Sequence, residues 1–316
     1  MSTYRTALPQ LAVRIYLTDG GIETTLIFHE GIDLPDFAAF VLLDEDREEG
    51  GREALRRYFE SYLAVAKRDQ RGIVLETATW RASRDWGARL GYSPEALADL
   101  NRSAVELLVE LRAAHETPQS PVVISGCVGP RGDGYQPESL MTPGEAEDYH
   151  AEQVGVFAGT AADLVTAITM THTGEAIGFA RAAAAAGIPS VVSFTVETDG
   201  RLPSGESLGE AVEVVDAETG SAPAYYMVNC AHPTHVDKTL IAGDGWQARI
   251  RGLRANASTM SHAELDMSET LDTGDPADLG ARYADLTVAL PQLTVLGGCC
   301  GTDARHISAI SAACRG

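Results

Sequence analysis

Short apolar runs alternate with longer amphipathic stretches along the chain. The runs are about four to eight residues long, which is the length of a buried strand, and several are apolar throughout, as strands covered on both faces are. Eight of them are predicted as strands, at 14–19, 72–79, 121–126, 163–169, 189–196, 224–229, 248–253 and 293–298.

The stretches between these runs carry the start and stop signals of helices. Ser93 is expected to cap a helix that has Pro94 at its first position. The segment from Thr142 to Glu145 matches a capping box, in which a hydroxyl and a carboxylate satisfy the free N–H groups of a helix start. Gly187 follows an alanine-rich segment and is predicted to end that helix, because glycine tolerates left-handed backbone.

Strands that alternate with helices form parallel sheets, because each helix returns the chain to the same edge of the sheet. Eight such units predict an α/β fold of the closed (β/α)8 TIM barrel type. We expect a single domain over residues 1–316, since the sequence shows no linker or low-complexity tract. Active sites of such barrels lie at the carboxyl ends of the strands, so the residues that follow each predicted strand are the candidates for function.

Composition and charge narrow the function classes. The chain has 316 residues, of which 45% are hydrophobic, and a formal net charge of −21. This charge repels phosphate backbones and argues against nucleic acid. No apolar run approaches the ~20 residues that cross a bilayer, and the start of the chain lacks a signal-peptide pattern. We therefore expect a cytoplasmic protein with small-molecule partners. The sequence is compatible with a homo-oligomer.

The cysteines that follow two predicted strands are the most informative residues. Cys230 ends the sixth strand, and Cys299 and Cys300 end the eighth, so a closed barrel places all three on one rim. Three thiols form a sulfur-rich Zn²⁺ site with a fourth position open to water or substrate. Adjacent strand residues point to opposite faces, so we expect Gly297 and Gly298 to permit an unusual backbone there.

Two other interpretations of these cysteines stay open. Cysteine is often a small buried hydrophobic residue, and a disulfide between Cys299 and Cys300 would need a strained backbone and an oxidising setting. Five cysteines in so long a chain do not indicate a disulfide scaffold. Three thiols at converging strand ends favour a metal, which would stabilise the nucleophilic thiolate form of a bound thiol.

At these residues the chain resembles a known family. The matching segments are LTDGG (17–21), TATWRAS (77–83), SGCVGP (125–130), DYH (148–150), SFT (193–195) with DGRLPSGESL (199–208), VNC (228–230) and GGCCGT (297–302). Together they resemble the zinc-dependent homocysteine S-methyltransferases, including the betaine- and S-methylmethionine-dependent members. The last two segments are quite specific, and the others are weak alone.

The resemblance implies an activity and a ligand set. A zinc ion held by Cys230, Cys299 and Cys300 would bind the homocysteine thiolate, which would attack a methyl group of a sulfonium or quaternary ammonium donor and give methionine. The same three cysteines are then the catalytic residues. The chain has no evident cobalamin or folate module, which argues against the large methionine synthases.

Several strand-end residues are candidates for binding substrate. Asp19 could hold substrate or only form a turn, Glu76 could contact an amino group or form a rim salt bridge, and Trp80 could pack against a cationic donor or only fill space. His172 and His232 could each complete a metal coordination shell, but a hydrogen-bonded loop histidine is the simpler expectation for both. The full set of substrate-binding candidates is Asp19, Gly20, Gly21, Glu76, Thr77, Trp80, Asn229 and Asn256.

Three departures from the family pattern affect the predicted amino-acid pocket. The family commonly has T-E after the opening glycines, whereas Thr25 follows Thr24 here. It commonly has E-T at the end of the fourth strand, where Ile168 and Thr169 stand, and the Y-P-N-S segment of the seventh strand appears as 254–257, which keeps only Asn256. The metal site therefore matches the family while the amino-acid pocket differs.

These departures keep other functions open. The chain could be a zinc- or thiol-binding barrel that acts on a different thiol or has lost methyl transfer. A zinc hydrolase is a third alternative, but the sequence lacks an evident cluster of histidine and carboxylate ligands, and three thiols better suit sulfur chemistry.

Overall fold

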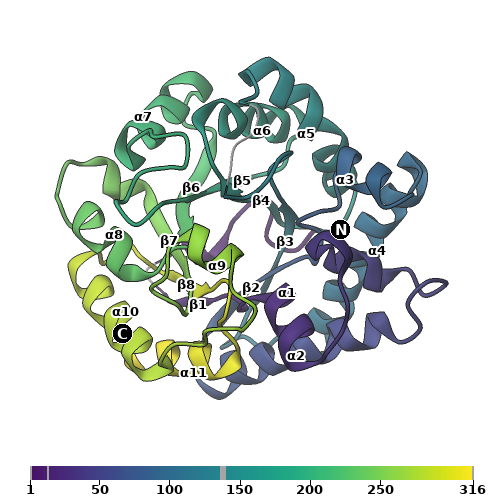
Figure 1. The fold of residues 1–316 in the computed structure, drawn as a ribbon, viewed down its shortest axis with the longest axis horizontal. Coiled ribbons are helices and arrows are strands. Elements are labelled where there is room, and N and C mark those ends of the chain that lie inside the picture. Colours follow the sequence, from purple (N-terminus) through teal and green to yellow (C-terminus); the bar gives the residue numbers. More distant parts are fainter. Residues whose placement is uncertain (1, 13, 136–139, 315–316) are drawn as a thin grey trace.

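The computed structural model describes residues 2–12, 14–135 and 140–314 and confirms the predicted barrel. Eight parallel strands close in sequence order, with helices around them (Figure 1). The strands are β1 Tyr16–Leu17, β2 Gly72–Glu76, β3 Val122–Val128, β4 Leu164–Met170, β5 Ser190–Thr195, β6 Pro223–Asn229, β7 Ile250–Ala255 and β8 Val295–Gly298. All eight predicted strands exist, and β1 is shorter than expected.

The helices form an outer layer. They are α1 Ile22–Thr24, α2 Gly51–Arg68, α3 Arg84–Arg89, α4 Pro94–His115, α5 Pro143–Ala158, α6 Thr173–Ala186, α7 Leu208–Thr219, α8 Pro233–Leu240, α9 His262–Asp266, α10 Pro276–Ala289 and α11 Ala304–Ala313. Short 3-10 or π turns occupy Pro9–Leu11, Thr25–His29, Pro35–Phe37, Ala39–Leu43 and Trp246–Arg249. Within the described ranges, no helix combines the length and apolarity that a membrane span requires.

The predicted caps are confirmed. The Ser93 hydroxyl accepts a hydrogen bond from the Ala96 N–H at the start of α4. Thr142 and Glu145 form a reciprocal capping box at the start of α5. Gly187 ends α6 with φ +68°, a left-handed conformation that glycine adopts without a steric penalty.

Strand alternation divides the core into two parts. Ile73 and Leu75 belong to the cluster between strands and helices, whereas Val74 belongs to the cluster inside the barrel. Because side chains alternate along a strand, Glu76 shares the interior face with Val74. Ile168 and Cys127 also belong to the interior cluster, so the carboxyl ends of the strands surround a pocket that contains these groups.

A buried ion pair ties the N-terminal segment to the barrel. Asp163 is fully buried, and its carboxylate accepts hydrogen bonds from Arg112 Nη1 at 2.8 Å and from the backbone N–H groups of Thr3, Tyr4 and Ile124. One carboxylate therefore links helix α4, strand β3 and the start of the chain, at a distance from the pocket.

This pair predicts a stability effect. Arg112→Met should lower the free energy of unfolding by about 3–5 kcal/mol, because it leaves Asp163 buried without its counter-charge. Arg102→Met is the matched control, since its pair with Asp99 is exposed and should contribute less than about 1 kcal/mol. Denaturant unfolding of both variants measures the difference, and equal losses would contradict the role given to Asp163.

Candidate functional site

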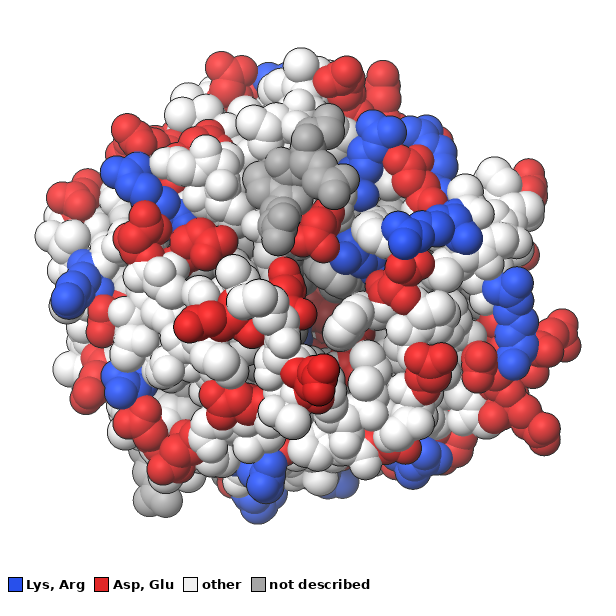
Figure 2. Space-filling view, viewed as in Figure 1, with Lys and Arg blue, Asp and Glu red and all other residues white. Residues whose placement is uncertain are grey.

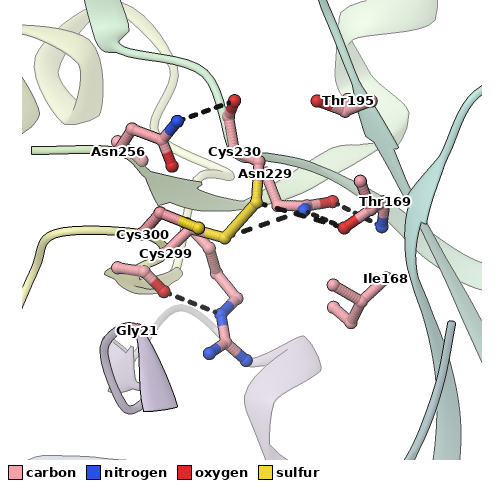
Figure 3. The surroundings of a disulfide bond; sticks show 12 residues. Gly21, Ile168, Thr169, Thr195, Asn229, Cys230, Asn256, Cys299 and Cys300 are labelled. Atoms are coloured by element: carbon pink, nitrogen blue, oxygen red, sulfur yellow. Dashed lines mark hydrogen bonds between the residues drawn. A yellow bond between two sulfur atoms is a disulfide. The ribbon is translucent and has the colours of Figure 1, made fainter. Parts of the chain in front are cut away.

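The barrel brings the three predicted cysteines together. Their Sγ atoms all lie within 4.8 Å of one another, although 69 residues separate Cys230 from Cys299. Cys230 and Cys299 are joined as a disulfide and Cys300 is a free thiol (Figure 3). The disulfide thus links the ends of β6 and β8, and it does not join the adjacent cysteines. The predicted clustering on one rim is confirmed.

The backbone at Gly297 and Gly298 does not have the unusual conformation that the sequence predicted. Gly297 and Gly298 lie within β8, and neither has a positive φ. They are needed for space, because a Cβ on Gly297 would overlap Thr18 and one on Gly298 would overlap Thr302. The unusual conformations lie at Cys230, with φ +53°, and at Gly301, with φ +78°.

Hydrogen bonds hold the backbone of Cys230. Its carbonyl accepts from Asn256 Nδ2 at 3.0 Å and lies 2.7 Å from His262 Nε2 (Figure 3 shows the Asn256 bond). His262 stacks on Tyr135 with ring centroids 4.0 Å apart, and the Tyr135 hydroxyl lies 3.6 Å from Cys300 Sγ. Tyr135 and His262 were not predicted as site residues, since only the fold brings their loops to the cysteines.

Asn229 is also engaged by the protein. Its Oδ1 accepts from the Thr169 N–H at 3.0 Å and its Nδ2 donates to the Thr169 hydroxyl at 2.9 Å (Figure 3). Oδ1 also accepts from the Ser193 hydroxyl at 2.6 Å. Asn229 and Asn256 are not among the residues that line the pocket, and their side chains instead bond Thr169, Ser193 and the Cys230 carbonyl. The other predicted substrate residues do line it with the three cysteines: Asp19, Gly20, Gly21, Glu76, Thr77 and Trp80.

Asp19 forms a buried ion pair. Its Oδ1 lies 2.7 Å from Arg254 Nη2, and its Oδ2 accepts from the Tyr58 hydroxyl at 3.0 Å. Arg254 also donates to the Gly298 carbonyl at 3.1 Å, which joins the ends of β1, β7 and β8. Burial alone would lower the pKa of Arg254, but Asp19 and Glu76 raise it above its usual value. Both Asp19 oxygens therefore already have partners.

Glu76 is in a different electrostatic state. It is 5% exposed, and its Oε2 has no hydrogen-bond partner among the described residues. Burial raises the pKa of Glu76 to about 7, against the opposing effect of Arg254. Burial likewise raises the pKa of Glu23, a second pocket residue, to about 7. The pocket thus holds two carboxyl groups that ionise near neutral pH.

Trp80 lines the pocket, but its ring contacts a cation of the protein itself. Its indole N–H donates to the Ile168 carbonyl at 3.2 Å, and the Arg81 guanidinium lies over its ring at 4.0 Å. One face of the predicted platform for a cationic donor is therefore covered by a cation of the protein. Arg81 also lines the pocket and was not predicted as a site residue.

The structure also places the positions that depart from the family pattern and the two loop histidines. Ile168 lines the pocket and presents an apolar surface, while Thr24 lines it and Thr25 does not. His172 accepts a hydrogen bond from the Glu175 N–H, and His232 does the same for Thr234 at the start of α8. Both histidines cap helices, as expected for loop histidines. Figure 2 shows that this face is hollowed near its centre, with acidic side chains on several sides of the opening and basic side chains at its upper right.

Comparisons with known proteins identify relatives of this chain along most of its length. Selenocysteine Se-methyltransferase of Brassica oleracea var. italica is 24% identical, with 93% of this chain and 87% of the relative covered. Homocysteine S-methyltransferase 4 of Zea mays is also 24% identical, with 95% and 89% covered.

Solved structures share the fold. The homocysteine methyltransferase MmuM from Escherichia coli is 20% identical in both its metallated and its oxidized form, with TM-scores of 0.73 and 0.75. The alignments cover 95% and 98% of this chain and 96% and 99% of those chains. The family model described as homocysteine S-methyltransferase matches residues 16–314, which confirms the predicted resemblance and makes the chain a methyltransferase. The chain belongs to the homocysteine S-methyltransferase family.

Proposed function

We propose that this methyltransferase moves a methyl group from a sulfonium or quaternary ammonium donor, of the S-methylmethionine or betaine type, to the thiol of homocysteine and so gives methionine. Zinc held by Cys230, Cys299 and Cys300 is part of the proposal. The observation that carries it is the meeting of three sulfur atoms within 4.8 Å at the pocket.

The cysteines fit such an ion. Sulfurs around a tetrahedral zinc lie about 2.3 Å from the metal, and three sulfurs within 4.8 Å of one another are compatible with one centre. Only thiolates bind the metal, so the disulfide between Cys230 and Cys299 must be reduced first. Bound zinc would favour the thiolate form of the acceptor at neutral pH. This need for reduced thiols supports a cytoplasmic setting.

The residues of the chain position the reactants. Asn256 and His262 hold the carbonyl of Cys230, and the pair of Asp19 with Arg254 fixes neighbouring strand ends. The enclosing walls keep the acceptor sulfur, the methyl carbon and the leaving group in line. Such orientation can lower the barrier by up to ~10 kcal/mol.

We further propose that Glu76 receives the amino group of the acceptor. Asp19 is neutralised by Arg254 and Ile168 carries no charge, whereas Glu76 lines the pocket with one oxygen unpartnered among the described residues. A protonated amine would supply the missing hydrogen bond and counter-charge.

A second candidate function follows from two other residues of the same pocket, Asp19 and Ile168. Asp19 is paired with Arg254 and Ile168 is apolar, so neither side chain offers a free charge to an amino acid, which favours a thiol acceptor other than homocysteine, or binding without transfer. Retention of zinc without turnover across several thiols and donors would support the binding function.

Zinc content tests the ligand set. Protein purified under reducing conditions should hold about one zinc per chain, and Cys299→Ala should lose both the metal and methyl transfer. Cys314→Ala is the matched control, because Cys314 is buried outside the cluster and should keep both. Full zinc and full activity in Cys299→Ala would remove the mechanism.

Glu76 predicts a pH dependence. It is ionised above a pKa of about 7, so the KM for homocysteine should rise as the pH falls below that value. Comparison with 4-mercaptobutyrate, which lacks the amino group, cancels the ionisation of the acceptor thiol. Glu76→Gln should raise the KM for homocysteine by about tenfold or more, and leave that for 4-mercaptobutyrate little changed.

Glu213→Gln is the control for this experiment, because Glu213 is exposed on α7 and should behave as the wild type. An unchanged preference for homocysteine over 4-mercaptobutyrate in Glu76→Gln would show that Glu76 does not bind the amine.

A further inference from the structure

Arg81 is held in a fixed position at the pocket. The residue is only 6% exposed, and its guanidinium carbon lies 4.0 Å from the centroid of the Trp80 ring and 3.8 Å from that of Trp86. Nη1 donates to the Gly132 carbonyl at 2.9 Å. Two indole rings and one hydrogen bond therefore hold the cation in place.

Trp80 and Trp86, which form a clamp around Arg81, are themselves held by close contacts. Trp80 packs against Gly129, where an added Cβ would lie 2.8 Å from the indole Cδ1. The Trp80 N–H is fixed on the Ile168 carbonyl at 3.2 Å, and the Trp86 N–H donates to the Arg131 carbonyl at 3.0 Å. The two indoles that contact Arg81 are thus anchored, and a larger residue at Gly129 would displace Trp80.

The charge of Arg81 is poorly balanced by the described residues. Its salt-bridge partner is Asp133, whose carboxylate lies 3.9 Å away and is 46% exposed, and its Nε has no hydrogen-bond partner among the described residues. Arg254 differs, since Asp19 lies 2.7 Å from it in a buried pair. Burial lowers the pKa of Arg81 to about 10, and this effect outweighs the opposing attraction of Asp133, Glu23 and Asp36.

We propose that Arg81 binds a carboxylate group carried by one of the two substrates. A planar guanidinium matches a carboxylate with two parallel hydrogen bonds, and the stacked indoles leave its edge as the direction for such a ligand. Arg254 is already committed to Asp19, so Arg81 is the pocket arginine available for this task. The inference rests on the proposed function and names the anionic end of its ligands.

A carboxylate could come from the acceptor or from the donor, and matched pairs of compounds separate the two sources. Homocysteine is compared with 3-mercaptopropylamine, and S-methylmethionine with (3-aminopropyl)dimethylsulfonium; each second compound lacks only the carboxylate. The kcat/KM of the zinc-loaded enzyme is measured for each pair with wild type, Arg81→Gln and Arg81→Lys.

Wild type should prefer the carboxylated member of one pair by about 10- to 100-fold, which is the effect of a charged hydrogen bond. Arg81→Gln should lose this preference through a higher KM for the carboxylated compound, and should change the kcat/KM for the compound without the carboxylate much less. Arg81→Lys should keep only part of the preference, because lysine lacks the planar fork. The affected pair identifies the source.

Arg89→Gln is the matched control. Arg89 also lies over Trp86, at 5.3 Å, but it is 63% exposed and outside the pocket, so its variant should keep the wild-type preference. Equal preferences in wild type and Arg81→Gln for both pairs would overturn the proposal, as would a wild type with no preference.

A binding measurement separates this inference from the proposed function. Titration of zinc-loaded protein with the same four compounds, followed by tryptophan fluorescence, reports a carboxylate at Arg81 even if no methyl transfer occurs. Carboxylate-dependent binding that Arg81→Gln abolishes would support the subsite without turnover. Binding that is independent of the carboxylate would sink the subsite whatever the activity.

Discussion

The site depends on the hydrogen-bond register of three adjacent strands at the end of the barrel. The Cys230 N–H donates to the Arg254 carbonyl at 3.1 Å, and the Cys299 N–H donates to the Ala255 carbonyl at 2.8 Å. Strand β7 therefore holds the residues that follow β6 and β8 at fixed heights on either side of it. Because a shift by one residue would turn side chains to the opposite face, this register decides whether the sulfurs meet.

The charged groups of the pocket fall into two kinds, those that pair with another residue of the protein and those that burial alone affects most. Asp19 and Arg254 neutralise each other and connect the ends of neighbouring strands, so this pair stabilises the fold at the rim of the barrel. Glu76 Oε2 and Arg81 Nε have no hydrogen-bond partner among the described residues. Burial raises the pKa values of Glu76 and Glu23 and lowers that of Arg81, so it favours the neutral form of each group. Buried groups in this state gain most from a ligand of opposite charge, which is the chemistry of a zwitterionic substrate.

The sequence predicted the features that depend on local pattern. The strands, the caps at Ser93 and Thr142 and the meeting of the cysteines follow from periodicity and from the order of strands in a barrel. It did not predict the pair of Asp19 with Arg254 or the clamp around Arg81, because these contacts join side chains whose approach only the folded loops determine. The role expected for Gly297 and Gly298 was wrong for a related reason: crowding by side chains from elsewhere, and not backbone conformation, requires glycine there.

Zinc K-edge X-ray absorption of the reduced, zinc-loaded protein tests the central claim most directly. Three sulfur neighbours at about 2.3 Å with one lighter ligand are expected, and a fourth sulfur should replace the lighter ligand when homocysteine is added. A zinc shell dominated by nitrogen and oxygen, or one unchanged by the thiol, would contradict the assignment of Cys230, Cys299 and Cys300 as the centre of the chemistry.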